Sequence, residues 1–374
     1  MTANKYILLG LILVLGTINI AVGLVALCLY VISTLRLTSS PRYNLITIFL
    51  SIKIVIIMVI HILYSQKSTF SLIQTLSTDI LFLLFLFVKI DVIDFRKLLY
   101  PLVALFFLDL TFNLSTVIFG VDPIGRGAGF RPGDFIPRLN GVFGSPLATV
   151  AISVSAIFMG FLLQKRWLIV LGFFAILING TFRAPLTAIL IVSYFILLKM
   201  RFRFSLLVFS SFIFASLVVV ATVFSAIQAG GIDGSGTGFV TGNQLRVIAW
   251  THALEKIPAS PWIGTHTFSS GDFEMSIDTI REFGIAEAPW LQLALDYGVI
   301  VALLDFLALF MLVKINIKRF YENNNNPFYF GVALFTIVMV TERFYGVLYG
   351  SFFLTSIFFL ACVSARGRRF NGLV

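Results

Sequence analysis

The sequence predicts an all-α, polytopic transmembrane protein with about eleven spans (ten to twelve) and one large loop outside the membrane. Its 374 residues are 59% hydrophobic and only 12% charged, and the mean hydropathy is +1.01. A soluble domain carries about 25% charged residues. Apolar runs of about 20 residues, the length of a membrane-crossing helix, recur along the chain. The period-two alternation of a membrane barrel is absent from them.

The expected spans are separated by short polar turns. They cover residues 6–31, 43–64, 70–88, 98–119, 142–163, 167–179, 185–199, 204–227, 289–313, 328–341 and 345–363. The pairs 167–179/185–199 and 328–341/345–363 are short for full crossings, and polar turns at 179–183 and 342–343 interrupt them. Broken helices at membrane depth are tolerated only inside protein or beside a wet cavity. We therefore expect Arg183 and Arg343 to face such a cavity.

These spans divide the chain into three parts. Residues 1–227 form N-terminal transmembrane helices with an arginine-rich outer loop at 120–141, and residues 289–374 form C-terminal transmembrane helices. Between them, residues 228–288 make the one long stretch that is not apolar, beginning with a glycine- and serine-rich segment. Site chemistry is expected in this loop.

The distribution of Lys and Arg predicts the orientation, because cytoplasmic turns carry the excess of both. The richer set of turns holds Arg36, Arg42, Lys89, Arg96, Lys97, Lys165, Arg166, Lys199, Arg201, Arg203, Lys314, Lys318, Arg319, Arg366, Arg368 and Arg369. This places the N-terminus and loop 228–288 on the outer, non-cytoplasmic side of the membrane. One helix more or fewer would reverse the N-terminus but not the loop.

The opposite side favours arginine over lysine. Its basic residues are Arg126, Arg131, Arg138, Arg183, Arg246, Arg281, Arg343, Lys5, Lys67 and Lys256. Guanidinium groups bind phosphate or carboxylate in a bidentate manner and stay charged when partly desolvated. We expect an anionic ligand at the outer membrane–water boundary, although single arginines could be solvated or bind lipid headgroups. The net charge of +10 is scattered over turns and does not indicate nucleic acid.

Candidate binding residues lie in two of these outer segments. Arg138 and Asn140 belong to a stretch running Arg-Leu-Asn-Gly and ending in Ser145-Pro146, which marks a turn followed by a helix start, where anions bind. Arg246 and Trp250 are spaced to share one face of a short helix. Trp262 follows, and with Trp250 it offers a stacking surface.

Candidate acid–base groups are Glu287, His266 and His252. Pro289 suits the first turn of a helix, so Glu287 stands near the positive end of that helix. A capping role for this carboxylate remains open. The histidines can exchange protons near neutral pH. No Cys or Asp pattern accompanies them, so no metal site and no cofactor are expected. Cys28 and Cys362 lie in apolar spans and are expected to be buried free thiols.

Taken in order, these motifs resemble the O-antigen ligase/polymerase family of bacterial envelope glycan assembly. The matches are Arg138 with Ser145-Pro146, Arg183 at a helix break, Arg246 with Trp250, residues 261–264 (Pro-Trp-Ile-Gly), and Glu287 ahead of Gly298. They span about residues 138–300. The Glu287 position resembles the one at which family ligases carry a histidine-asparagine pair at the start of a helix. The Glu-Ala of this chain departs from that pattern and favours the polymerase branch.

The resemblance implies polymerisation of undecaprenyl-diphosphate-linked oligosaccharide repeat units into O-antigen or another surface polysaccharide. The reaction would be a metal-independent, inverting glycosyl transfer on the outer side of the membrane, between a lipid-linked donor and a lipid-linked acceptor. Arginines would hold the diphosphate, and Glu287, or else His266 or His252, would act as general base. The family also implies a chain-length regulator protein as partner.

Two alternatives remain open: an O-antigen ligase using the same donor, and a transporter or flippase of lipid-linked sugars.

Charged groups inside spans are costly and usually pair. We expect Lys53 to pair with Asp109, Asp79 to lie near the membrane interface, and neither these groups nor Asp305 to belong to the active site.

Overall fold

The computed structural model describes residues 2–18, 20–34, 44–64, 69–87, 92–120, 139–142, 146–179, 183–228, 242–265, 288–323, 326–345 and 361–362. Over these ranges the chain forms helices and turns without a β-strand. The helices in the first half are α1 (Thr2–Ile18), α2 (Ile20–Thr34), α3 (Asn44–Tyr64), α4 (Thr69–Leu86), α5 (Val92–Phe119), α6 (Pro146–Leu163) and α7 (Arg166–Leu177). Those in the second half are α8 (Arg183–Lys199), α9 (Phe204–Gln228), α10 (Gly242–Lys256), the short η1 (Ile257–Ala259), α12 (Pro289–Tyr297), α13 (Val299–Glu322) and α14 (Pro327–Tyr345).

Four helical stretches in the described ranges are long and apolar enough to cross a membrane. They are Asn44–Tyr64, Phe95–Phe119, Phe204–Ile227 and Val299–Glu322. Large apolar side chains such as Ile62, Phe209 and Val220 are exposed on them, as expected of surfaces that face lipid. The all-α class and the membrane-spanning character of these helices agree with the sequence. The total of about eleven spans and the outer position of the large loop stay predictions.

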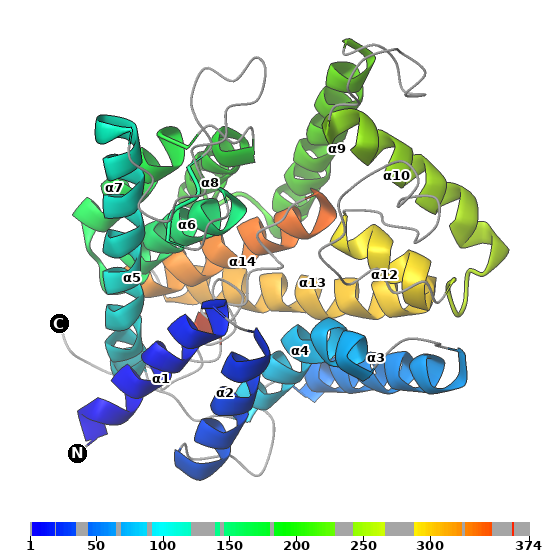
Figure 1. The fold of residues 1–374 in the computed structure, drawn as a ribbon, viewed down its shortest axis with the longest axis horizontal. Coiled ribbons are helices and arrows are strands. Elements are labelled where there is room, and N and C mark those ends of the chain that lie inside the picture. Colours follow the sequence, from blue (N-terminus) through cyan, green and yellow to red (C-terminus); the bar gives the residue numbers. More distant parts are fainter. Residues whose placement is uncertain are drawn as a thin grey trace.

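Helix α14 lies at the centre of the bundle and packs against α6, α8, α9, α12 and α13 (Figure 1). Residues 328–341 of this helix are all buried. Phe335 stacks on Phe158 of α6 with ring centroids 4.0 Å apart, and Asn316 of α13 donates to Thr336 over 2.9 Å. A helix that is apolar all round belongs in the interior of a bundle. The other elements are therefore arranged around α14.

The expected first span, 6–31, is instead a pair of helices. Helices α1 and α2 pack against each other, and the Tyr30 hydroxyl donates to the Lys5 carbonyl oxygen. Residue 5, near the start of α1, thus lies beside residue 30, near the end of α2, so the chain reverses between the two helices. The side of the membrane on which the N-terminus lies stays a prediction.

Two further boundaries differ from the sequence prediction. The expected span 289–313 divides at Gly298 into α12 and α13. The expected polar turn at 342–343 is part of α14, which continues as a helix to Tyr345. Most of the expected span 345–363 lies outside the described residues. The other predicted interruption is confirmed, since α7 ends at Leu177 and α8 begins at Arg183.

Candidate functional site

A short turn, residues 139–142, is held by side chains of α5, the first turn of α6 and the residues just after α7. The Val142 amide donates to the Asp109 carboxylate over 2.9 Å, and Asn113 donates to the other oxygen of Asp109 over 3.1 Å. From α7, the Asn179 side-chain amide donates to the Leu139 carbonyl oxygen over 3.4 Å. Gly141 has φ +58°, and a Cβ there would lie 2.1 Å from Asp109 Oδ1 and 2.3 Å from Thr149 Oγ1. The turn is therefore fitted closely to α5 and α6.

This turn lies well below the end of α5. Asp109 precedes Phe119, the last residue of α5, by a distance of about 15 Å along the helix axis at ~1.5 Å per residue. That is about half of a ~30 Å hydrocarbon layer. Irregular backbone at such depth is tolerated only inside protein or along a wet cavity. The sequence predicted an outer loop at residues 120–141, and the position of the turn relative to a bilayer stays a prediction.

One predicted binding position lies in this turn, and a second follows a residue that contacts it. Asn140 is half-buried within the turn, and Arg183 is the first residue of α8, four residues after the Asn179 that contacts Leu139. Helix α6 begins at Pro146, and its Thr149 lies close to Gly141. The N-terminus of α6, whose free amides favour anions, therefore adjoins the turn. Arg138 and the side chain of Arg183 lie outside the described part of the structure.

Helix α10 carries Arg246, Trp250 and His252, and all three side chains are half-buried. The predicted helical spacing of Arg246 and Trp250 is confirmed. Ala253, one turn further on, is fully buried against Leu295 of α12. The indole N–H of Trp250 is enclosed and has no acceptor among the described residues. The polar loop is thus folded onto the membrane helices along this face of α10.

Residues 261–265 form a strap across the joint between α12 and α13. The Thr265 amide donates to the Leu295 carbonyl oxygen over 2.7 Å, and the Val299 amide donates to the Pro261 carbonyl oxygen over 2.8 Å. Gly264 has φ +77° and Gly298 has φ +91°. A Cβ on Gly264 would lie 2.4 Å from the Asp296 carbonyl, and one on Gly298 would lie 2.3 Å from the Trp262 carbonyl oxygen. Both glycines are therefore required by close backbone contact.

The strap leaves Trp262 on the surface, with 67% of its side chain exposed. Its ring is accessible to a ligand, as a stacking residue must be. The Pro261–Gly264 motif and Gly298 were recognised separately in the sequence. Their mutual contact explains why both occur, and it gives them a structural role beside any role in binding.

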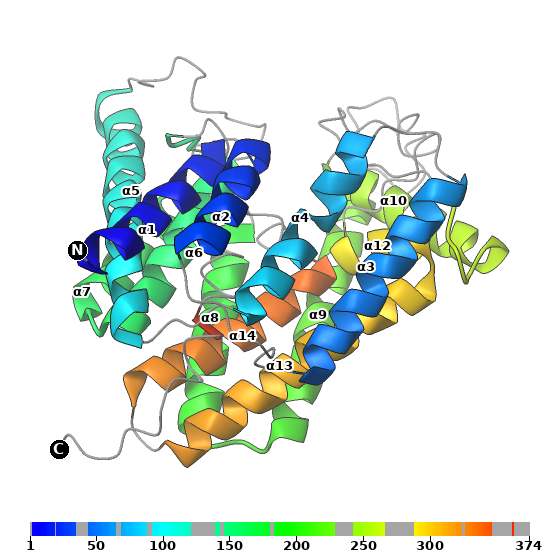
Figure 2. The ribbon, with the colours of Figure 1, turned by 90° about the horizontal axis from the view of Figure 1, so that it is seen from below.

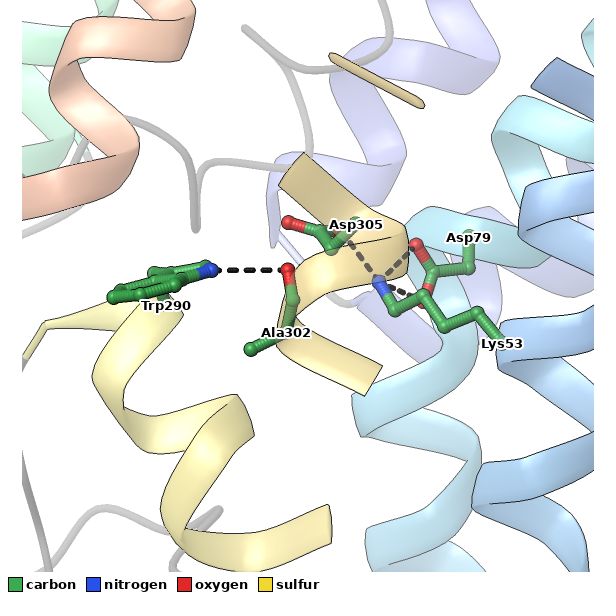
Figure 3. Close-up of polar contacts among 5 residues, drawn as sticks. All are labelled: Lys53, Asp79, Trp290, Ala302 and Asp305. Carbon is green, nitrogen blue, oxygen red and sulfur yellow. Dashed lines mark hydrogen bonds and ion pairs between the residues drawn. The ribbon is translucent and has the colours of Figure 1, made fainter. Parts of the chain in front are cut away.

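Helix α12 begins at Pro289 as predicted, with Ala288 as its N-cap and no side-chain cap. Glu287 precedes the N-cap and lies outside the described residues, as does His266. Trp290 is anchored on α13, because its indole Nε1 donates to the Ala302 carbonyl oxygen over 2.9 Å (Figure 3). The final turns of α14, which contain Arg343, end beside the start of α12 in both views (Figures 1 and 2). The Arg343 side chain is not described.

The described contacts thus divide the predicted site residues into two groups. Asn140 and the first residue of α8 belong to the junction around the 139–142 turn. Arg246, Trp250, His252 and Trp262 belong to a platform formed by α10, the strap and α12. Helix α14 packs against α6 and α8 on one side and α12 on the other, so it connects the two groups. Their convergence on one ligand stays a prediction.

A buried ionic cluster lies below the platform, and its pairing corrects the sequence prediction. Lys53 of α3 contacts Asp79 of α4 at 2.8 Å and Asp305 of α13 at 2.6 Å, with all three side chains buried (Figure 3). Asp109, its expected partner, instead supports the 139–142 turn. Asp79 is only 5% exposed, and its position relative to the membrane interface stays a prediction. The sequence marked these residues as costly but held no signal for which pairs form.

Metal ligands are not gathered in the described part of the chain. No three His, Cys, Asp or Glu side chains stand close enough there to share an ion. Both cysteines are free, Cys362 buried and Cys28 half-buried.

Fold and contacts together define a class: an all-helical protein with apolar helices of membrane-spanning length and a polar segment folded back onto them. No protein-family model matches the chain, and no curated protein matches it either. The resemblance to the O-antigen ligase/polymerase family therefore rests on the ordered motifs of the sequence.

Proposed function

We propose that the protein polymerises lipid-diphosphate-linked oligosaccharide repeat units by inverting glycosyl transfer at the outer face of the cytoplasmic membrane. The observation that carries the proposal is the platform. It fixes a helix bearing Arg246 and Trp250 against the helix that follows Glu287. In the proposal, Arg246 and the carboxylate of Glu287 act from this common support on a lipid headgroup at the outer membrane boundary.

The chemistry requires little beyond these groups. The acceptor hydroxyl oxygen attacks the anomeric carbon of the donor, while the bond from that carbon to the lipid diphosphate breaks. Glu287 takes the hydroxyl proton, with His266 or His252 as the alternative base. The leaving diphosphate carries the electron pair and is stabilised by Arg246 together with Arg138, Arg183 and Arg343. Attack from the face opposite the leaving group inverts the anomeric centre.

The junction around residues 139–142 supports the same proposal independently. It is an irregular turn beside the N-terminus of α6, where the free backbone amides suit a phosphate group. A ligase would use the same donor and the same groups. It would differ only in its acceptor.

A transporter of lipid-linked sugars is the second candidate, and the Lys53–Asp79–Asp305 cluster is the observation that favours it. Ionisable groups paired inside membrane helices often mark ion pathways. A transporter, however, does not need the ordered strap and platform that join the polar segment to α12 and α13.

Glycan analysis of cells carrying Glu287→Gln or Arg246→Ala separates the candidates. A polymerase defect leaves single repeat units in place of long chains, and a ligase defect leaves unattached polymer. A transport defect leaves lipid-linked units facing the cytoplasm. Glu255→Gln, an exposed carboxylate on α10, and Arg203→Ala, in the turn before α9, are matched controls. Full-length chains from both site variants, at normal protein levels, would refute the site.

A further inference from the structure

We propose that Lys53 and Asp305 are positioning residues that hold the start of α12 in place for the transfer. The inference rests on the proposed function for its chemical meaning, but its structural part can be tested without it. The ion pairs described for Lys53 and Asp305 join them to each other and to Asp79, and these three are not among the predicted site residues. Their effect would pass through α13 to Trp290 and from there to the residues around Glu287.

The ionic cluster joins two consecutive helices, α3 and α4, to α13, which lies far away in the chain. The Lys53 ammonium donates to Asp79 on α4 over 2.9 Å and to Asp305 on α13 over 2.6 Å. Asp79 lies on α4, which forms a hairpin with α3. Asp305 lies on α13, which packs against this hairpin. Lys53 is therefore the group that connects the α3–α4 hairpin to α13 by an ionic contact.

An apolar layer lies one helical turn from the cluster, on the side of the α12–α13 joint. Ile57 of α3 and Leu76 of α4 pack there with Tyr297 and Val301. Ile57, Leu76 and Val301 each lie three or four residues from the ionic residue on the same helix. Tyr297 is the last residue of α12. The hairpin thus contacts the joint at two successive levels. Figure 2 shows α3 and α4 beside α12 and α13 at this end of the bundle.

The path from the cluster to the site is short. Asp305 lies on the next turn of α13 from Ala302, whose carbonyl oxygen accepts the indole N–H of Trp290 over 2.9 Å (Figure 3). Trp290 stands in the first turn of α12, three residues after Glu287. A shift of α13 at Asp305 would therefore move the anchor of the residue that fixes the start of α12. Displacements of about 1 Å in reacting groups can cost about 100-fold in rate.

Matched alanine variants test the assignment. Asp305→Ala and Asp79→Ala remove the same atoms from buried positions, and each leaves Lys53 paired with one carboxylate. They differ only in which helix loses its contact, α13 or α4. Lys53→Met is unsuitable, because it would leave two buried carboxylates without their cation, a change that commonly prevents folding.

Initial rates of purified, reconstituted protein on a synthetic lipid-diphosphate repeat unit give the first readout. Positioning predicts that Asp305→Ala lowers kcat by about tenfold or more, with KM within about twofold, because orientation and not binding is lost. Asp79→Ala should lower kcat by less than about threefold. Equal losses in the two variants would overturn the proposal, since they would indicate a role in stability alone.

A cycle with Trp290→Phe tests the path. If Asp305 acts through Trp290, the double variant loses little more activity than Asp305→Ala alone. Independent, multiplying losses would contradict the path.

Hydrogen exchange of the same proteins separates this inference from the proposed function. The expected result is faster exchange of the α12 amides in Asp305→Ala and not in Asp79→Ala. If the wild-type protein extends no glycan, the proposed function fails while the exchange data still decide the positioning. Unchanged α12 exchange in Asp305→Ala would overturn the positioning even in an active enzyme.

Discussion

Replacing Gly298 by alanine should detach the strap from the α12–α13 joint. Gly298 has φ +91° and ψ 164°, a backbone region open essentially to glycine, so alanine there costs about 1–3 kcal/mol in strain. Its Cβ would lie 2.3 Å from the Trp262 carbonyl oxygen, so the strap must also shift. The shift would break the Val299–Pro261 and Thr265–Leu295 hydrogen bonds, each worth about 0.5–1.5 kcal/mol. Together these terms give a local loss of about 2–6 kcal/mol.

Hydrogen exchange of the Thr265 and Val299 amides measures this loss directly, because these are the two donors. At ~1.4 kcal/mol per factor of ten, exchange of both should accelerate at least about twentyfold. Gly120→Ala is the matched control, since Gly120 also has positive φ (+64°) but a Cβ there would meet nothing within 4 Å. The control variant should affect its own turn only. Unchanged exchange at Thr265 and Val299 in Gly298→Ala would refute the interlocking of strap and joint.

Three further predictions concern the turn, the platform and the core. Asp109→Asn weakens the acceptor of the Val142 amide, so the 139–142 turn should lose about 1–3 kcal/mol of local stability. Hydrogen exchange should show faster exchange of the Val142 amide and unchanged exchange of a control amide in α9. Arg246→Ala should lower the rate of glycan extension by about tenfold or more, and Arg246→Lys should restore only part of it, because lysine cannot bind phosphate in a bidentate manner; equal rates for all three proteins would contradict a diphosphate contact. Phe335→Ala should lower the free energy of unfolding by about 3–5 kcal/mol, because the ring is fully buried and stacked on Phe158. Phe209→Ala, on the exposed face of α9, should leave the free energy of unfolding near that of the wild type.

Features that depend on local signals could be predicted from the sequence. The break between α7 and α8 follows from a polar, glycine-containing turn between short apolar runs. The helix carrying Arg246 and Trp250 follows from their spacing, and the start of α12 follows from Pro289. In each case the residues that determine the structure are neighbours in the chain.

Features that depend on packing could not be predicted. The reversal between α1 and α2 is stabilised by the contact of the two helices over their length, which hydropathy does not record. The division at Gly298 is set by the strap, whose residues come more than thirty positions earlier. A polar pair at 342–343 looked like a turn, but helix α14 continues through it because its preceding turns are held inside the bundle.

The partner of Lys53 is the clearest case. The sequence favoured Asp109 as the partner and placed Asp79 near the membrane interface, although Asp79, Asp109 and Asp305 are all carboxylates within or near apolar runs. The choice depends on which helices adjoin α3, and these are α4 and α13. Asp109 faces the 139–142 turn instead, where it supports a predicted site segment that the sequence alone did not connect to it.

Reconstitution with one defined substrate tests the central proposal most directly. The purified protein is placed in bilayers with a synthetic undecaprenyl-diphosphate repeat unit, with no added metal and with chelator, and the products are separated by length. We expect lipid-linked glycans longer than one unit, with inverted linkage at each new bond, and their loss in Glu287→Gln but not in Glu255→Gln. Folded wild-type protein that leaves the repeat unit unextended, with and without an added candidate chain-length regulator, would contradict the proposed transfer.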